Sequence, residues 1–406
     1  MKHTLFLTLV LSMATFSAMS YDFEANGIYY EINGNEAIVT RNASSEYSGD
    51  VVIPETVSHE GATYTVTTIG DSAFYYCLEL TGVTIPNTVT TISSHAFWNC
   101  HELTNVTIGN SVTLIDDKAF YMCTSLPCIT LPDALTHIGS RAFGGCGKLE
   151  CVTIPNSVTS IDDEAFRSCR GMLSLTIGNS VTHIADYAFD SCTKLHELTI
   201  PSSVTHIGFR AFTSTALRSI IVDSNNPVYD SRENCNAIIK TSSNTLIKGC
   251  INSFIPGSIT LLADYAFFNV YCNDVRIPGS VTAIGDYAFA GTYVSRVTSL
   301  AVTPPTIEKN TFTQGSMDGN AILCVPFASR NAYLFAGWSK FRYIRGLGDI
   351  DNNNELTISD LVILIDYILN GTITYRDNPA ADVNGDGYIS ITDVTTLIQL
   401  LLSMSD

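Results

Sequence analysis

The sequence predicts a repeat solenoid of short parallel strands and short helical turns, followed by a small all-α domain. The first observation is a repeat, because an Ala-Phe pair returns every 23 residues over seven copies. A period of this length is typical of solenoids, since one such unit cannot bury its apolar face without a stacked neighbour. The second observation is charge: residues 348–406 hold ten carboxylates and one arginine, half of the chain's net charge of −18. This asymmetry indicates a separate C-terminal domain with a cation-related role. The seven pairs are Ala73-Phe74, Ala96-Phe97, Ala119-Phe120, Ala142-Phe143, Ala165-Phe166, Ala188-Phe189 and Ala211-Phe212.

The first 20 residues have the pattern of a signal peptide rather than of a folded element. Lys2 and His3 precede the apolar run 5–16, and Ala18-Met19-Ser20 fits a small-x-small cleavage site. The apolar run is too short to span a bilayer. We therefore expect an exported, soluble protein that begins near Tyr21 and is secreted or held at the cell surface, without membrane insertion or a lipid anchor. The acidic net charge argues against nucleic acid as a partner.

Residues 21–64 do not follow the repeat and are expected to form an N-terminal β cap. Strand-like segments 28–32 and 36–40 flank Asn33-Gly34, a dipeptide that favours a tight hairpin turn. The terminal coil of a solenoid exposes apolar surface unless another element covers it. We therefore expect this segment to cover the first coil.

Each repeat of the solenoid, residues 65–297, divides into segments with different roles. Val83-Thr84-Ile85 alternates inward and outward as a short strand does, and a proline or glycine then turns the chain. A second extended piece carries Val89 and Ile92, three residues apart. An Asp or Ser precedes the Ala-Phe pair, as Asp162 does, and this pattern predicts a capped short helical turn.

Six of the twelve cysteines lie three residues after the repeat Phe, and we expect them to form a ladder of small buried residues, one in each coil, with metal binding or disulfides as the alternatives. Cys128 and Cys151 share a different phase on adjacent coils. Stacked strands would place these two residues about 4.8 Å apart, within the range of Cα separations that a disulfide accepts. A disulfide and a pair of reduced thiols both remain open for them. The ladder residues are Cys77, Cys100, Cys123, Cys146, Cys169 and Cys192.

The register of the repeat breaks after Phe212, and the next Ala-Phe pair comes only at Ala266-Phe267. The excess falls in residues 223–250, where segments 237–240 and 245–248 predict an inserted β-hairpin. A contribution to a binding face and a decoration without function both fit this insertion.

Residues 298–347 are expected to close the solenoid. Residues 322–325 predict a last strand. The apolar residues that follow suit a helix over the open end, and they are Tyr333, Leu334, Trp338 and Phe341.

The acidic segment 348–406 contains two loops with the ligand spacing of calcium sites, each of which runs into a helix with an apolar face. Calcium is a hard ion, so carboxylate, amide and backbone oxygens must converge on it. Both loops end in Asp rather than in the Glu of the general EF-hand pattern, and Asn354 replaces the glycine of the first loop. We expect two calcium ions. Their ligands would be Asp349, Asp351, Asn353, Glu355, Thr357 and Asp360 in the first loop and Asp382, Asn384, Asp386, Tyr388, Ser390 and Asp393 in the second.

The repeat unit V-T-I-P-N-S-V-T-S-I-D-D-E-A-F-R-S-C, at Val152–Cys169, resembles the BspA-like leucine-rich repeats of bacterial surface proteins, and the similarity covers about residues 51–344. This resemblance implies adhesion or binding to cell surfaces and supplies no catalytic residues. The duplicated loop-helix segment, residues 348–406, resembles a type I dockerin, a calcium-binding domain. That resemblance implies a cohesin-domain partner, which attaches the protein to a scaffold or surface, with cohesin contacts at Ile358, Ser359, Ile391 and Thr392.

The outward position of the repeat strand is an unbroken row of threonines, the candidate binding face for an unknown surface protein or glycan. Threonine also suits an exposed strand for structural reasons alone, and this alternative remains open. The row comprises Thr84, Thr107, Thr130, Thr153, Thr176 and Thr199.

Three functions remain open, led by a non-catalytic recognition or adhesion protein attached through its dockerin. The alternative is a component of a cellulosome-like polysaccharide-degrading complex, with or without carbohydrate processing, and a structural spacer comes last. Enzymatic candidates are weak. Asp116-Asp117 and Asp162-Asp163 recur at the turn where capping explains them, and His137, His183 and His206 share an outward phase typical of exposed polar residues.

Overall fold

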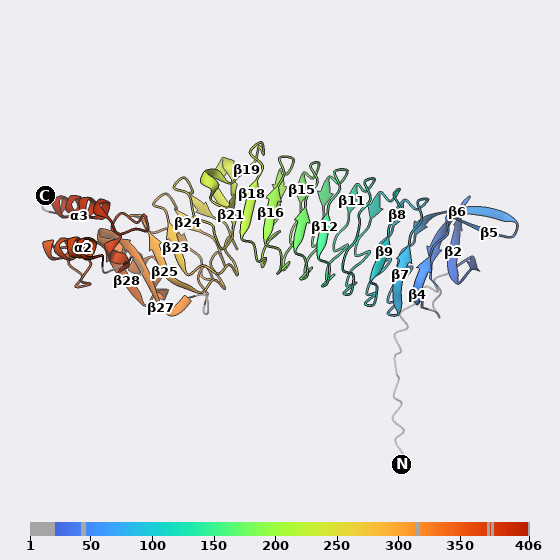
Figure 1. Cartoon of the computed structure of the whole chain (residues 1–406), viewed down its shortest axis with the longest axis horizontal. Helices are drawn as coiled ribbons and strands as arrows, with labels where there is room; N and C mark the ends of the chain where they lie inside the picture. The colour runs from blue at the N-terminus through green and yellow to red at the C-terminus, as the bar shows by residue number, and fades with distance from the viewer. Residues whose placement is uncertain (1–20, 42–45, 314–316, 372–373, 375–376, 405–406) are drawn as a thin grey trace, which may run out of the picture.

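The computed structural model describes residues 21–41, 46–313, 317–371, 374 and 377–404, and the predicted signal peptide lies outside them (Figure 1). The chain winds into an elongated stack of coils that runs from the N-terminal strands to a pair of helices at the opposite end (Figure 1). Of the helices in the described ranges, none is long and apolar enough to cross a membrane.

Antiparallel strands cover the first coil. The N-terminal strands are β1 (Phe23–Ala25), β2 (Ile28–Asn33), β3 (Glu36–Thr40), β4 (Gly49–Val52), β5 (Thr56–His59) and β6 (Ala62–Ile69). β1, β2 and β3 form an antiparallel meander in which Tyr30 faces Val39. β3 then pairs in parallel with β6, so the meander and the solenoid share one sheet.

Two rows of short parallel strands run along the solenoid, which confirms the fold predicted from the 23-residue repeat. The first row contains the Val-Thr-Ile segments and comprises β7 (Leu80–Thr84), β9 (Asn105–Thr107), β12 (Cys151–Thr153), β14 (Ser174–Thr176), β16 (Glu197–Ile200) and β18 (Ser219–Val222). The second row comprises β8 (Thr91–Ile92), β10 (Leu114–Ile115), β11 (His137–Ile138), β13 (Ser160–Ile161), β15 (His183–Ile184) and β17 (His206–Ile207). Equivalent residues pair from coil to coil: Thr153 faces Thr176 in the first row, and Ile161 faces Ile184 in the second.

The core of each coil is built around the repeat phenylalanine. From Phe74 to Phe212 the buried rings stack, with 4.8–5.4 Å between neighbouring centroids. The six cysteines of the predicted ladder are buried beside this stack, which confirms their structural role. From Cys100 onward each thiol donates a hydrogen bond to the Phe carbonyl of the preceding coil, as Cys146 does to Phe120 at 3.2 Å. The Phe120 carbonyl also accepts the Cys123 N–H at 3.2 Å, so the thiol adds a second donor that alanine or valine would not supply.

The segment around each Ala-Phe pair differs from the helical turn that the sequence predicts. It consists of consecutive turns, and the residue before the alanine has a positive φ, as Glu164 does at 58°. The Phe N–H donates to the Ala carbonyl of the next coil, for example from Phe166 to Ala188 at 2.8 Å. A helix would need these N–H groups for its own carbonyls. Stacking of the coils therefore replaces the helical turn.

The insertion after Phe212 interrupts the stack of rings. It contains β19 (Tyr229–Asp230), η1 (Arg232–Asn234), β20 (Ala237–Lys240), η2 (Thr241–Ser243) and β21 (Thr245–Gly249). β20 and β21 pair antiparallel, and β21 then pairs in parallel with β22 (Leu261–Leu262) of the next coil. Gly249 takes the place of the repeat phenylalanine, because its N–H donates to the Ala266 carbonyl. A Cβ atom at Gly249 would lie 2.2 Å from the Phe267 ring. The buried residues form two clusters that meet within the insertion, where Ile238 and Cys250 belong to the first cluster and Ile239 and Leu246 to the second.

Four longer strands and a short helix end the solenoid. The remaining elements of the solenoid are β23 (Asp274–Ile277), β24 (Ala283–Ile284), β25 (Val294–Ser299), β26 (Thr306–Ile307), β27 (Met317–Pro326), η3 (Phe327–Ser329), α1 (Arg330–Phe335), η4 (Trp338–Lys340) and β28 (Tyr343–Leu347). The Trp338 and Phe341 rings cover the last ring of the stack, with centroids 5.7 Å and 5.2 Å from that of Phe312.

Two expectations for this end need correction. The last strand is β28, which pairs in parallel with β27, and not residues 322–325. Tyr333 is buried as expected, but Leu334 is exposed and Trp338 lies in η4 beyond the helix. Gly337 separates the two elements with a left-handed φ of 84°, so one continuous helix cannot carry all four apolar side chains.

Two loop-helix units form the C-terminal domain, with α2 (Ile358–Asn370) and α3 (Ile391–Ser403) as its helices and η5 (Pro379–Ala381) between them. Leu364 of α2 and Leu397 of α3 are fully buried in a small core that also contains Ile350 and Leu356. This core is distinct from the two clusters of the solenoid.

Candidate metal loops and binding face

The first acidic loop joins β28 to α2 and brings three carboxylates together. Ligand atoms of Asp349, Asp351 and Asp360 lie within 4.8 Å of one another. Asp360 is fully buried, and its Oδ2 accepts the Thr357 N–H at 2.9 Å. Asp349 is also buried: its Oδ2 accepts the Asn354 N–H at 3.1 Å, while its Oδ1 has no hydrogen-bond donor within the described chain.

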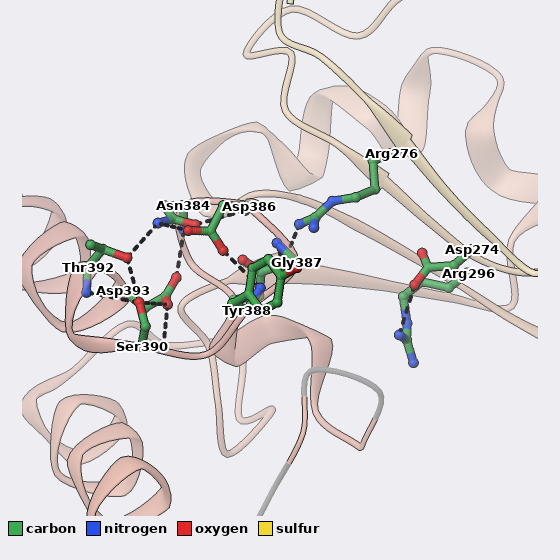
Figure 2. A network of polar contacts seen from close by, with 11 residues as sticks. Asp274, Arg276, Arg296, Asn384, Asp386, Gly387, Tyr388, Ser390, Thr392 and Asp393 are labelled. Carbon is green, nitrogen blue, oxygen red and sulfur yellow. Dashed lines mark hydrogen bonds and ion pairs between the residues drawn. The ribbon is translucent and has the colours of Figure 1, made fainter. Parts of the chain in front are cut away.

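The second loop, between η5 and α3, repeats the two buried carboxylates and their bonds to backbone N–H groups (Figure 2). Asp393 is buried and accepts the N–H groups of Asn384 at 3.1 Å and Ser390 at 2.8 Å. Asp382 is buried, and its Oδ2 accepts the Gly387 N–H at 3.0 Å. As in Asp349, Oδ1 of Asp382 is buried without a donor among the described residues.

Left-handed backbone bends both loops at matching positions. Asn352 and Asn354 have φ values of 59° and 68° in the first loop, and Gly385 and Gly387 have values of 73° and 97° in the second. Asparagine enters this region more readily than most residues. Asn354 therefore makes the turn that glycine makes in the second loop, as the sequence predicts.

The hydroxyl groups in the loops have a role that the sequence analysis missed. Thr357 Oγ1 accepts the Ser359 N–H and Ser390 Oγ accepts the Thr392 N–H, each at 3.2 Å, at the starts of α2 and α3. The acids Asp360 and Asp393 complete a capping box in each helix. The Thr-x-x-Asp and Ser-x-x-Asp spacing could have revealed these caps. Each acid thus fixes the start of a helix while it faces the loop.

The two loops fit a calcium ion. A buried carboxylate oxygen without a donor is costly unless a cation or a proton accompanies it, and Asp349 and Asp382 each have one. Burial raises the pKa of both carboxyl groups. The atoms available to coordinate an ion are all oxygens, which a hard cation such as calcium prefers. The predicted ligands would hold the ion in each loop. Of these, Asp349, Asp360, Asp382 and Asp393 are buried, whereas the side chains of Asp351, Asn353, Glu355, Asp386 and Tyr388 are exposed.

The residues predicted to contact a cohesin lie on the surface at the starts of the two helices. Ile358 is 71% exposed and Ile391 is 67% exposed, although both are large apolar side chains. Ser359 and Thr392 beside them are exposed as well. The apolar surface continues along each helix at corresponding positions, which are Ile365 and Leu369 in α2 and Ile398 and Leu402 in α3.

The six threonines of the predicted binding face are all exposed; five lie in strands of the first row, and Thr130 lies at the equivalent position of a coil that has no strand there. Within the described residues, none of their hydroxyl groups has a hydrogen-bond partner in the protein. A second set of threonines differs, because the Thr113 and Thr136 hydroxyls each donate to the threonine carbonyl of the preceding coil, at 3.2 Å and 3.0 Å. Cys128 and Cys151 form a parallel bridge beside the exposed row, and both are exposed free thiols.

The residues weighed as enzymatic candidates have structural partners. Oδ1 of Asp117 accepts the Ser140 N–H and Oδ1 of Asp163 accepts the Asp186 N–H, so these acids connect neighbouring coils. His183 and His206 stack with ring centroids 4.1 Å apart. Burial, followed by the neighbouring His183, lowers the pKa of His206.

Comparison with known proteins adds two families and a set of related folds. The model of the BspA type leucine-rich repeat region matches residues 61–172, 115–237 and 240–355, and the model of the dockerin type I domain matches residues 347–402. The chain is similar to the crystal structure of a leucine rich cell surface protein from Faecalibacterium prausnitzii A2-165, with 27% identity, a TM-score of 0.64, and coverage of 82% of this chain and 97% of that one.

A leucine-rich repeat protein from Bacteroides ovatus ATCC 8483 shares the fold at 24% identity and a TM-score of 0.57, over 81% of this chain and 77% of that one. The comparison with curated proteins returned no match.

Proposed function

The chain belongs to the BspA-type leucine-rich repeat family and ends in a type I dockerin domain, and from this premise we propose that it is an exported, non-catalytic binding protein. Its solenoid would recognise a surface protein or glycan. Its dockerin, with two calcium ions, would attach it to a cohesin-bearing scaffold. The observation that carries this proposal is the exposed apolar surface at equivalent positions of α2 and α3.

The two helices supply a surface that fits a protein partner. Ile358 and Ile391 follow the two calcium loops directly, so the loops set the position of both side chains. Apolar side chains of this size are seldom left exposed together unless a partner covers them. The serine and threonine beside them, Ser359 and Thr392, would add polar contacts at the same place. Calcium would therefore control the interface through the start of each helix.

Binding to cohesin domains tests the attachment. Isothermal titration of the full chain against a panel of purified cohesin domains should give calcium-dependent binding to at least one of them. The double variant Ile358→Asp with Ile391→Asp should lose that binding, because buried charges replace the apolar contacts. Val52→Asp is a matched control, since Val52 is an exposed apolar residue of β4, a strand at the opposite end of the solenoid (Figure 1). Equal binding by the double variant would reject this interface.

The threonine row supports recognition by the solenoid. Its hydroxyls are exposed and leave donors and acceptors available to a ligand, whereas the Thr136 hydroxyl is used within the protein. Successive coils repeat the same group along the first strand row, for instance Thr153 beside Thr176. A regular row of this kind matches an extended ligand with a repeated polar group.

Charge substitutions test this face. Thr130→Asp with Thr153→Asp should weaken adhesion to target cells and binding on a glycan array. Thr159→Asp is the matched control, because Thr159 is an exposed threonine beside the second strand row of the same coil. Unchanged adhesion by the double variant would leave the row with a structural role only.

The dockerin also favours a second candidate, membership in a polysaccharide-degrading complex. In that case the solenoid would bind the polysaccharide or a neighbouring component. A reducing-sugar assay on plant and microbial polysaccharides separates the two candidates from an enzyme. We expect no hydrolysis, and hydrolysis of any of them would contradict the non-catalytic assignment.

A further inference from the structure

The dockerin covers the outer face of the last solenoid strands. Arg276 of β23 occupies the strand position at which earlier coils have an exposed threonine, and it aligns through Thr298 and Cys324 with Arg345. Thr298 is only 5% exposed, although it faces outward. The Gly348 N–H donates to the Ala380 carbonyl at 2.8 Å and joins the end of β28 to η5. The first strand row thus ends in basic residues beneath an acidic domain.

Arg276 reaches directly into the second calcium loop (Figure 2). Its guanidinium forms an ion pair with Oδ2 of Asp382, a residue 106 positions further along the chain. The backbone of the loop lies close to the solenoid: a Cβ atom at Gly387 would be 2.2 Å from Arg276 Nη1, and one at Gly385 would be 2.3 Å from Leu300 Cδ2. The second loop therefore packs against β23 and the end of β25.

The first loop provides an internal comparison. Asp349 is the counterpart of Asp382, and both have one buried oxygen without a donor. Among the described residues, Oδ2 of Asp349 accepts one hydrogen bond, from the Asn354 N–H. Oδ2 of Asp382 accepts the Gly387 N–H and also forms an ion pair with Arg276. The predicted ligands of the two loops are closely similar, and the loops differ in the Arg276 guanidinium, which pairs with the second loop.

We propose that Arg276 makes the two calcium sites unequal, because it weakens calcium binding at the second loop. The same residue couples calcium binding at that loop to release of the loop from the solenoid. This inference rests on the proposed calcium role of both loops. A guanidinium ion and a calcium ion that share the Asp382 carboxylate repel each other, and the carboxylate charge is divided between them. When calcium fills only the tighter first loop, Arg276 holds the folded dockerin against the solenoid, and calcium at the second loop loosens that contact.

The surroundings leave space for such a change. A cavity of about 440 Å³ lies between the second loop and the solenoid, lined by Phe254, Arg276 and Leu300 on one side and by Gly385 and Asp386 on the other. A loosely filled contact can shift without breaking either core, because the dockerin and the solenoid have separate clusters of buried residues.

Calcium titration of the full chain tests the inequality. Isothermal titration of the calcium-free protein should resolve a tight and a weak site, and Asp349→Asn and Asp382→Asn should assign them to the first and second loops. Arg276→Gln should raise the affinity of the weak site about tenfold, the size of effect expected from one nearby charge, and leave the tight site unchanged. Arg276→Lys keeps the charge and should behave like the wild type. Arg170→Gln, an exposed arginine in the middle of the solenoid, controls for net charge.

The outcomes separate this inference from the calcium role itself. Two sites whose affinities do not respond to Arg276→Gln, or a second site that the substitution weakens, would overturn the inference and leave the calcium role intact. Failure of every variant to bind calcium would overturn both.

Hydrogen exchange with mass spectrometry tests the coupling without reference to cohesin. Raising calcium from a concentration that fills only the first loop to one that fills both should protect residues 382–393 and increase deuterium uptake in β23, Asp274–Ile277. In Arg276→Gln the uptake of β23 should already be high when only the first loop is filled. Protection of β23 on calcium addition would contradict the proposed release.

Discussion

Phe166 and Phe189 stack almost parallel, with ring centroids 5.3 Å apart and an angle of 2° between the ring planes. Both rings are fully buried, and each belongs to a different coil. The contact therefore joins neighbouring repeats rather than elements of one repeat. In a solenoid these contacts between neighbours supply much of the stability, since each coil touches only the coils beside it.

We predict that Phe166→Ala destabilises the solenoid by about 3–5 kcal/mol, the cost of a large buried cavity. Guanidinium unfolding followed by the near-ultraviolet signal measures the loss. Phe335→Ala is the control, because Phe335 is 90% exposed and its removal should change stability little. A similar midpoint for Phe166→Ala and the wild type would show that the stack is not the main contact between coils.

Lys248 should destabilise the folded protein at neutral pH. It stands at the position of the repeat alanine in the coil that has Gly249 in place of phenylalanine. Its side chain is only 4% exposed, and its Nζ has no hydrogen-bond partner in the part of the chain that the structure describes. Burial lowers the pKa of Lys248 from 10.5 to about 8. Below pH 8 the folded protein must carry this buried charge.

We therefore expect Lys248→Met to be more stable than the wild type at pH 7 by about 3 kcal/mol. Between pH 8 and about 10.5 the unfolded chain holds the lysine proton and the folded chain does not, so the stability of the wild type rises relative to the variant. Unfolding midpoints of both proteins across this pH range provide the measurement, and the comparison cancels the titration of other groups. Lys240→Met, at an exposed site on β20, is the control. A wild type that is more stable than Lys248→Met at pH 7 would contradict this prediction.

The repeat made the solenoid predictable, whereas contacts without a period could not be found in the sequence. Phe166 and Cys169 recur at fixed spacing, so their burial follows from the pattern alone. The turns before them were expected to be helical, because the sequence does not reveal that Phe166 donates its N–H to the next coil. In one coil Lys248-Gly249 stands in place of Ala-Phe. The sequence did not reveal this replacement, because the insertion shifts the phase of the repeat.

The acidic loops were predictable for the same reason, since the spacing of their carboxylates is local. Asp349 and Asp360 belong to one loop, and the short distance between them follows from its length. The ion pair from Arg276 to Asp382 joins two domains across 106 residues. No local pattern indicates that pair, because it depends on how the dockerin lies on the solenoid.

The cysteines should differ sharply in reactivity. The thiolate is the reactive form of cysteine, and burial raises the pKa of the Cys146 thiol to about 12. Cys128 and Cys151 are exposed. Brief treatment of the native protein with iodoacetamide should therefore label these two residues and leave the ladder unmodified, as peptide mass spectrometry would show.

The same experiment resolves the state of the exposed pair. If Cys128 and Cys151 form a disulfide in the native protein, labelling will require a reductant. Unfolded, reduced protein provides the control, because all twelve cysteines should then react. Rapid labelling of Cys146 in the native protein would contradict the buried ladder.

Removal of calcium should unfold the dockerin and leave the solenoid intact. The dockerin depends on a small core, and four of its carboxylates, Asp349, Asp360, Asp382 and Asp393, are at most 3% exposed. Without a cation these buried charges repel one another, and the capping boxes that start α2 and α3 lose the support of the metal. Because α1 is only six residues long, the helical circular dichroism of the described chain comes mainly from α2 and α3. We expect excess EDTA to abolish most of this helical signal while the near-ultraviolet spectrum of the solenoid persists, and excess calcium to restore it. Asp349→Asn with Asp382→Asn should show the low helical signal even in calcium, and retention of the full signal in EDTA would show that the dockerin folds without the ion.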